Sequence, residues 1–141
     1  MEQSIQKLRV WAGIVLSLLL LQLVLGLAAM KILTISVSNP WFGSHPAGLL
    51  DVHAILGLLI FALAFHMFAL SRRAASSKRQ ADIGLGGIAL ATITGALFVQ
   101  TGGTSNIFSD LMALGIFVAI VGYGWMMLAS SPLARSSSSE D

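Results

Sequence analysis

Two histidines inside apolar stretches are the residues of this chain best placed to do chemistry. His53 lies in the first part of the second apolar stretch, and His66 lies near the other end of the same stretch. An imidazole buried in hydrocarbon needs a partner that lipid does not supply, so an ionisable residue there is a functional candidate by default. We therefore predict a ligand-binding or catalytic role for His53. The alternative is an imidazole that only hydrogen-bonds a neighbouring hydroxyl or carbonyl group.

The two histidines cannot share one small ligand. They are thirteen residues apart, which corresponds to about 20 Å along a helix axis and about 220° around it. His66 lies close to the expected membrane interface, where snorkelling to water explains it as well as a weak role in cofactor binding does.

Asp51 and Gly57 flank His53 in the sequence. Asp51 precedes His53 by two residues and is a weak candidate for catalysis, alone or as a carboxylate pair with Asp110. Both acids fall in the first turns of predicted helices, where the helix dipole favours negative charge, and this structural explanation is preferred. Gly57 follows one turn after His53 on the same face, where it would leave room for a flat macrocycle.

The stretches that carry these residues are long enough to cross a bilayer. Of the 141 residues, 56% are hydrophobic and 10% are charged, whereas a soluble domain carries about a quarter charged residues. A hydrocarbon core is spanned by about 20 helical residues, and lipid requires every backbone polar group to be paired within the helix. The sequence predicts an all-α membrane protein, a four-transmembrane-helix bundle in residues 1–130, with spans at about 8–30, 46–70, 83–100 and 107–129.

Composition and charge set further limits. The chain has no cysteine, which excludes disulfides, thiolate metal sites and covalent c-type haem attachment. No basic stripe with interleaved aromatic residues indicates nucleic acid. Lys and Arg gather before the first stretch, in the second loop and after the fourth stretch, so we predict cytoplasmic N and C termini in a multi-pass protein of the plasma membrane. The serine-rich residues 131–141 are predicted to be a disordered cytoplasmic tail.

A short internal repeat relates the two halves of the chain. The second stretch opens with Asp51-Val52-His53-Ala54 and the fourth with Asp110-Leu111-Met112-Ala113, and a glycine follows each shortly afterwards. Gly26 and Gly95 occupy roughly corresponding positions in the preceding stretches. The pattern predicts two helix pairs of common origin, with His53 and Met112 at the same depth. Chance similarity in an apolar sequence is the alternative.

Small residues also recur at four-residue spacing in the third and fourth stretches. They are Gly87, Ala91, Gly95, Gly115 and Ala119. In membranes this spacing lets helix backbones approach closely. It predicts tight helix packing within the chain, or a homo-oligomer through these faces.

At these residues the chain resembles the four-helix haem-binding membrane proteins, in particular one half of a haem A synthase of the compact archaeal or bacterial type. The resemblance rests on a first loop rich in Gly, Pro and Trp, the His53-Ala-x-Leu-Gly entry into the second stretch, and Thr94-Gly95-Ala96-Leu97 in the third. It implies one haem held between histidines on the second and fourth helices. His53 matches the first position, and Ser109, Asp110 or Met112 stands at the second. His45 in the first loop would then be a candidate for contact with a haem propionate.

Three functions follow from these residues. The first is a b-type haem protein (haem o or a being the alternatives) with His53 and Met112 as axial ligands to iron, in electron transport with a membrane redox complex or a quinone. A haem held by His53 alone would instead suit small-ligand binding or chemistry at the iron, and an enzyme would be an oxidoreductase of the haem A synthase type. The second function is a cofactor-free accessory or assembly subunit of a respiratory complex. The third, a transporter, has little support because no span is interrupted by an internal proline.

Overall fold

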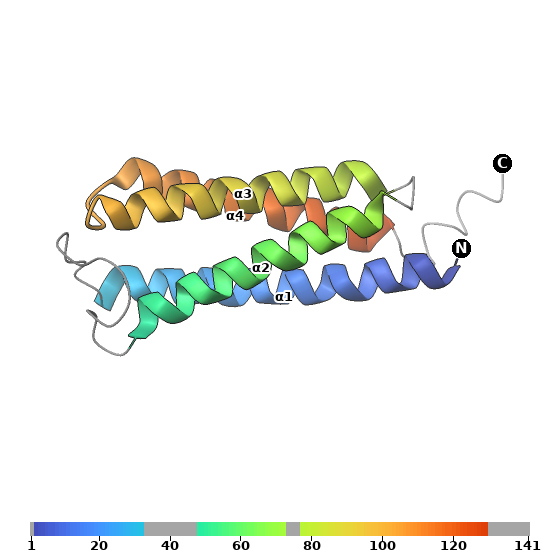
Figure 1. Cartoon of the computed structure of the whole chain (residues 1–141), viewed down its shortest axis with the longest axis horizontal. Helices are drawn as coiled ribbons and strands as arrows, with labels where there is room; N and C mark the ends of the chain where they lie inside the picture. Colours follow the sequence, from blue (N-terminus) through green and yellow to red (C-terminus); the bar gives the residue numbers. More distant parts are fainter. Residues whose placement is uncertain (1, 33–47, 73–76, 130–141) are drawn as a thin grey trace.

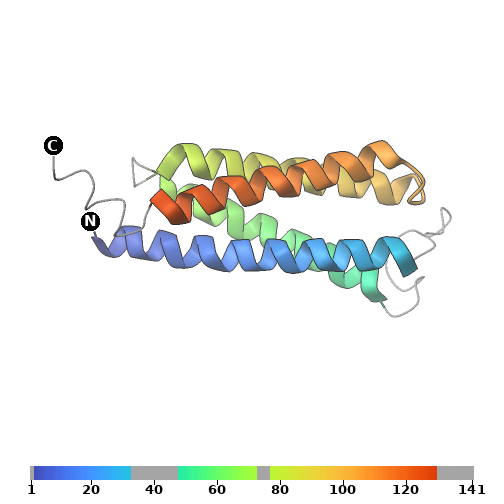
Figure 2. The same cartoon turned by 180° about the vertical axis from the view of Figure 1, so that it is seen from behind.

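The computed structural model describes residues 2–32, 48–72 and 77–129, which form four antiparallel α-helices in chain order (Figure 1, Figure 2). The helices are α1 (Glu2–Ile32), α2 (Leu49–Ser71), α3 (Lys78–Gln100) and α4 (Asn106–Ala129). α1 packs against α2 and α4, and α3 packs against the same two helices. These described ranges contain no strand, and all four helices are long and apolar enough to cross a membrane. The predicted fold class is therefore confirmed.

The helix ends differ from the predicted spans for local reasons. α1 begins at Glu2 and α3 at Lys78, several residues before the apolar runs, because Glu, Gln, Lys and Arg are good helix formers outside hydrocarbon. α2 begins at Leu49, directly after Gly48 with a φ angle of 60°. Pro46, where the second span was expected to begin, and the expected tail at 131–141 lie outside the described residues.

Most of the helical surface is apolar and is not covered by the rest of the chain. Between 22% and 33% of the residues in each span are buried inside the bundle. Large apolar side chains such as Val24, Leu58 and Phe117 are more than half exposed. Such a surface is unfavourable in water and compatible with hydrocarbon. The chain thus has the surface of a multi-pass membrane protein in a lipid bilayer.

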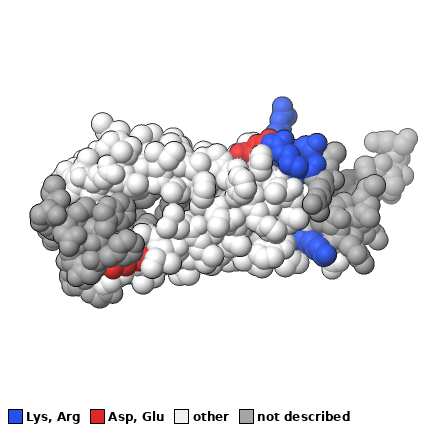
Figure 3. Space-filling view, in the orientation of Figure 1, with Lys and Arg blue, Asp and Glu red and all other residues white. Residues whose placement is uncertain are grey.

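The cationic side chains in Figure 3 lie at one end of the bundle, where α1 begins and α4 ends. At this end Arg72 forms an ion pair with Asp82 on α3 at 3.0 Å, and its guanidinium lies 4.2 Å from the centroid of the Phe68 ring. The positive-inside rule predicts that this end is cytoplasmic. We refer to it as the inner end and to the opposite end as the outer end.

Glycines bring α3 and α4 into backbone contact. A Cβ atom on Gly87 would lie 2.6 Å from the backbone nitrogen of Ala119 and from the oxygen of Gly115. A Cβ atom on Gly115 would in turn lie 2.6 Å from the oxygen of Gly87 and 2.7 Å from the nitrogen of Ala91. The predicted tight packing therefore occurs within one chain. A homo-oligomer stays a prediction, and it would need surfaces other than these.

Burial matches in part between corresponding helices of the two pairs, with a shift of 59 residues between α2 and α4 and of 69 residues between α1 and α3. A shift of 59 residues carries His53 onto Met112, and it also carries buried Ile60, Ala64 and Met67 onto buried Ala119, Tyr123 and Met126. A shift of 69 residues carries Gly26 onto Gly95. The same shift carries four buried residues of α1 onto four of α3 or its N-cap, namely Leu8, Ala12, Val15 and Leu19 onto Ser77, Ala81, Gly84 and Ile88.

The oblique course of α2 makes the two halves of the bundle different. α2 ends close to α3 at the inner end and begins beside α1 at the outer end (Figure 1, Figure 2). In the inner half, side chains such as Val15, Met67 and Tyr123 fill the space between the helices and are fully buried. In the outer half the α1–α2 pair diverges from the α3–α4 pair, and a cavity lies between them.

Candidate functional site

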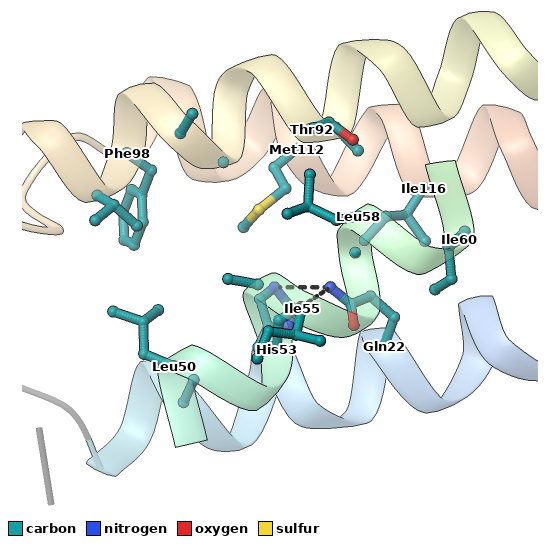
Figure 4. Close-up of a pocket in the computed structure, with 18 of the residues that line it drawn as sticks. Gln22, Leu50, His53, Ile55, Leu58, Ile60, Thr92, Phe98, Met112 and Ile116 are labelled. Atoms are coloured by element: carbon teal, nitrogen blue, oxygen red, sulfur yellow. Dashed lines mark hydrogen bonds between the residues drawn. The ribbon is translucent and has the colours of Figure 1, made fainter. Parts of the chain in front are cut away.

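The cavity in the outer half has a volume of about 610 Å³ and is lined by all four helices (Figure 4). This volume lies within the range of about 300–1,000 Å³ that is typical of ligand pockets. The wall is mainly aliphatic, and glycines and alanines contribute much of it because they leave space that larger side chains would fill. The side chains with hydrogen-bonding groups in the wall are those of Gln22, His53, Thr92 and Thr104.

The turn after α3 lines the outer part of the cavity. Gly102 and Gly103 have φ angles of 66° and 72°, which glycine adopts without strain. The N–H of Gly103 donates to the oxygen of Phe98 and that of Gly102 to the oxygen of Val99, both at 3.0 Å. This is the Schellman arrangement that ends a helix at glycine. Both glycines line the cavity with backbone alone, and Thr104 of the same turn adds its side chain to the wall.

His53 lies on α2 with its ring against α1. α2 begins at Leu49, four residues before His53, so His53 lies about 6 Å from the outer end of the helix. A Cβ atom on Gly26 would lie 3.1 Å from Cε1 of the imidazole. Gly26 therefore provides the space that the ring occupies. His53 lines the cavity, as expected for a ligand-binding residue, and it is half-buried.

Gln22 on α1 is the partner of His53, and it was not singled out from the sequence. Its Nε2 donates to the backbone oxygen of His53 at 2.9 Å and lies 3.2 Å from Nε2 of the imidazole. The contact with a carbonyl oxygen requires a donor, so it fixes the orientation of the amide. The second amide proton is then available to the imidazole Nε2, which acts as acceptor and leaves the ring proton on Nδ1.

Two polar atoms of this pair have no partner among the residues that the structure describes. They are Nδ1 of His53 and Oε1 of Gln22, and both are buried. Buried polar groups are normally hydrogen-bonded, and an exception calls for an explanation such as a missing ligand or a functional role. A glutamine inside the first apolar stretch was the available sequence signal, because polar side chains inside spans are rare.

Met112 lies on α4, on the opposite wall of the cavity. Its sulfur is 3.3 Å from the position of a Cβ atom on Gly95 of α3. In Figure 4 the thioether of Met112 points into the cavity from the α3–α4 side, and His53 lies on the α1–α2 side. Of the three residues expected at the second ligand position, Met112 lines the cavity, while Ser109 and Asp110 do not. The structure therefore brings His53 and Met112 to one cavity.

The remaining candidate residues have other surroundings. Gly57 lines the cavity, but the position of a Cβ atom there is 3.2 Å from the amide nitrogen of Gln22, so this space receives the amide. Asp51 lies in the first turn of α2 and is not in the cavity wall. His66 is exposed on the inner half of α2, with its ring centroid 5.7 Å from that of Trp11. His45 lies outside the described residues.

The donor set can be tested against the haem that the sequence resemblance implies. Imidazole and thioether groups are both axial ligands of haem iron, and here they line an apolar cavity from opposite walls. No group of three or more His, Asp or Glu side chains in residues 2–32, 48–72 and 77–129 could hold a metal ion on its own. The residues present therefore fit a metal whose other ligands come from a macrocycle, as in haem. Binding of the metal to the imidazole Nε2 requires that the Gln22 amide first leave this atom.

No protein-family model matches this chain, and no curated protein or solved structure matches it either.

Proposed function

We propose that this protein binds one b-type haem in the outer cavity and is a membrane haem protein related to the haem A synthases. His53 would be one protein ligand to the iron, and Met112 is the candidate for the other. The observation that carries the proposal is that these two side chains, from different helix pairs, line the same apolar cavity.

The chain's own residues would supply ligation, orientation and exclusion of water. Gly26 on α1 leaves room for the imidazole, and Gly95 leaves room for the Met112 thioether. The aliphatic wall provides a low dielectric around the cofactor, which is one of the means by which proteins tune haem. A haem with His and Met ligands has a raised reduction potential, which suits electron transfer. With His53 as the sole protein ligand, the open position suits an oxidoreductase acting on small molecules.

The cavity wall continues into the lipid-facing surface. Ile55 and Leu58 line the cavity and are 58% and 61% exposed. An apolar cofactor could therefore enter from the bilayer between the helix pairs. Access from the lipid also suits electron transfer with a quinone or with a membrane redox complex of the plasma membrane. In this proposal the inner end of the bundle lies in the cytoplasm.

The second candidate function is a cofactor-free accessory or assembly subunit of a membrane complex. It is favoured by one specific contact, because the amide of Gln22 already engages the Nε2 atom that iron would need. Such a subunit would keep the bundle and use its exposed apolar helix faces against a larger partner.

The experiment that separates these functions is a visible spectrum of the protein purified in mild detergent from cells supplied with ample haem. A Soret band with sharp α and β bands after reduction, at about one haem per chain, supports the haem protein. A flat spectrum from well-folded protein supports the accessory subunit and rejects haem binding.

A further inference from the structure

In the contact between Gln22 and His53, the atom positions indicate which group donates the hydrogen bond. The amide nitrogen of Gln22 lies 2.9 Å from the carbonyl oxygen of His53 and 3.2 Å from the imidazole Nε2. One amide proton satisfies each acceptor. This arrangement assigns the imidazole proton to Nδ1 and directs the Nε2 lone pair at Gln22 on α1.

The rest of this polar pair is poorly satisfied. Nδ1 of His53 and Oε1 of Gln22 are buried, and neither has a partner within the described ranges. A buried network that is only partly satisfied is less stable than one in which every donor and acceptor is paired. Exchange of the Gln22 amide for another group on Nε2 thus gives up one neutral hydrogen bond and no ion pair.

The structure also gives the amide room to leave. Gln22 borders the cavity, so its side chain has space on that side. Gly57, on the facing turn of α2, presents no side chain to the amide.

We propose that Gln22 is a displaceable cap on His53, which occupies the imidazole Nε2 in the cofactor-free protein and competes with haem iron for it. This inference rests on the proposed function, because it describes how haem gains access to its ligand. Gln22 is then a positioning residue: it holds the ring in one tautomer before binding and lowers the affinity for haem by the strength of one hydrogen bond.

The proposal predicts tighter haem binding when the cap is removed. A neutral hydrogen bond that must be broken on binding raises the dissociation constant by about two- to ten-fold. Gln22→Leu and Gln22→Ala should therefore bind haemin two- to ten-fold more tightly than the wild-type protein. Ser17→Ala is the matched control, because Ser17 is exposed on α1 and its hydroxyl bonds only to the oxygen of Gly13 of the same helix.

The test combines haemin titration, followed by the Soret band, with ¹⁵N NMR of the histidine side chains in the cofactor-free protein. We expect His53 to show the Nδ1–H tautomer in the wild type and in Ser17→Ala, and to lose this preference in Gln22→Leu. Equal haemin affinity in the wild type and both Gln22 variants, or a His53 tautomer that does not respond to Gln22, would overturn the cap. Absence of haemin binding in every variant would instead reject the proposed function and the cap with it.

Discussion

The imidazole of His53 on α2 fits against Gly26 on α1, where a Cβ atom would lie 3.1 Å from Cε1 of the ring. The second helix pair repeats this relationship, because a Cβ atom on Gly95 of α3 would lie 3.3 Å from the sulfur of Met112 on α4. In each pair, the glycine of the first helix makes room for a candidate ligand on the second. These two contacts lie at positions that the predicted repeat relates to each other.

Replacement of Gly26 by alanine should displace the His53 ring. A contact at 3.1 Å is tighter than ordinary van der Waals packing, and overpacking of this kind costs about 1–3 kcal/mol. We expect haemin affinity to fall by roughly five-fold or more in Gly26→Ala. Gly86→Ala on α3 is the control, since a Cβ atom at Gly86 has no neighbour within 4 Å. Equal affinity in the two variants, measured by haemin titration, would show that the ring position does not matter for binding.

Gly57→Ala distinguishes two explanations of this glycine. From the sequence, Gly57 is expected to leave room for a macrocycle, and its replacement should then weaken haem binding. In the structure the space beside it holds the Gln22 amide, 3.2 Å from the Cβ position. A methyl group there should disturb the cap on His53, so we expect haemin affinity to stay the same or to rise. A clear loss of affinity in the titration would favour the macrocycle explanation.

Gly87→Ala should destabilise the bundle itself. Its Cβ atom would lie 2.6 Å from backbone atoms of Gly115 and Ala119, which cannot move without separating α3 from α4. We expect a loss of about 1–3 kcal/mol or more, seen as a lower midpoint of thermal unfolding in detergent. Gly124→Ala on α4 has open space around its Cβ position and should leave the midpoint nearly unchanged. Similar midpoints for both variants would mean that the close α3–α4 contact does not form.

Met112→His tests the second ligand. If Met112 faces the iron opposite His53, an imidazole at this position should give a low-spin spectrum with two nitrogen ligands. The ferric protein should then show the electron paramagnetic resonance signal of a bis-imidazole haem. A spectrum identical to that of the wild type would remove Met112 from the ligand set and leave His53 as the sole protein ligand.

The membrane fold could be predicted from the sequence because it depends on a signal repeated along the whole chain. Four apolar stretches of spanning length leave a helical bundle as the available structure in lipid. The small residues of α3 and α4 also indicated close packing, and Gly87 and Gly115 are indeed in backbone contact. The ends of α1 and α3 were less predictable, because polar residues such as Glu2 and Lys78 continue a helix beyond the apolar run.

The site was predictable only in part. His53 and Met112 stood out through residue type and the repeat, and both line the cavity. Gln22 did not, because its role depends on the pairing of α1 with α2 across thirty-one residues of sequence. It also has no polar counterpart in α3, since the 69-residue shift between α1 and α3 carries it onto Ala91. The cavity itself arises from the oblique course of α2 between its neighbours, a tertiary property that no local pattern encodes.

The central claim is that His53 holds a haem in the outer cavity, and haemin titration of a matched pair of histidine variants tests it most directly. His53→Ala removes the proposed ligand, whereas His66→Ala removes an exposed imidazole of the same helix that lies outside the cavity. We predict that the wild type and His66→Ala bind about one haem per chain with the same Soret spectrum, and that His53→Ala loses most or all of its haem binding because the proposed protein ligand is gone. Equal binding by His53→Ala and the wild type would contradict the account.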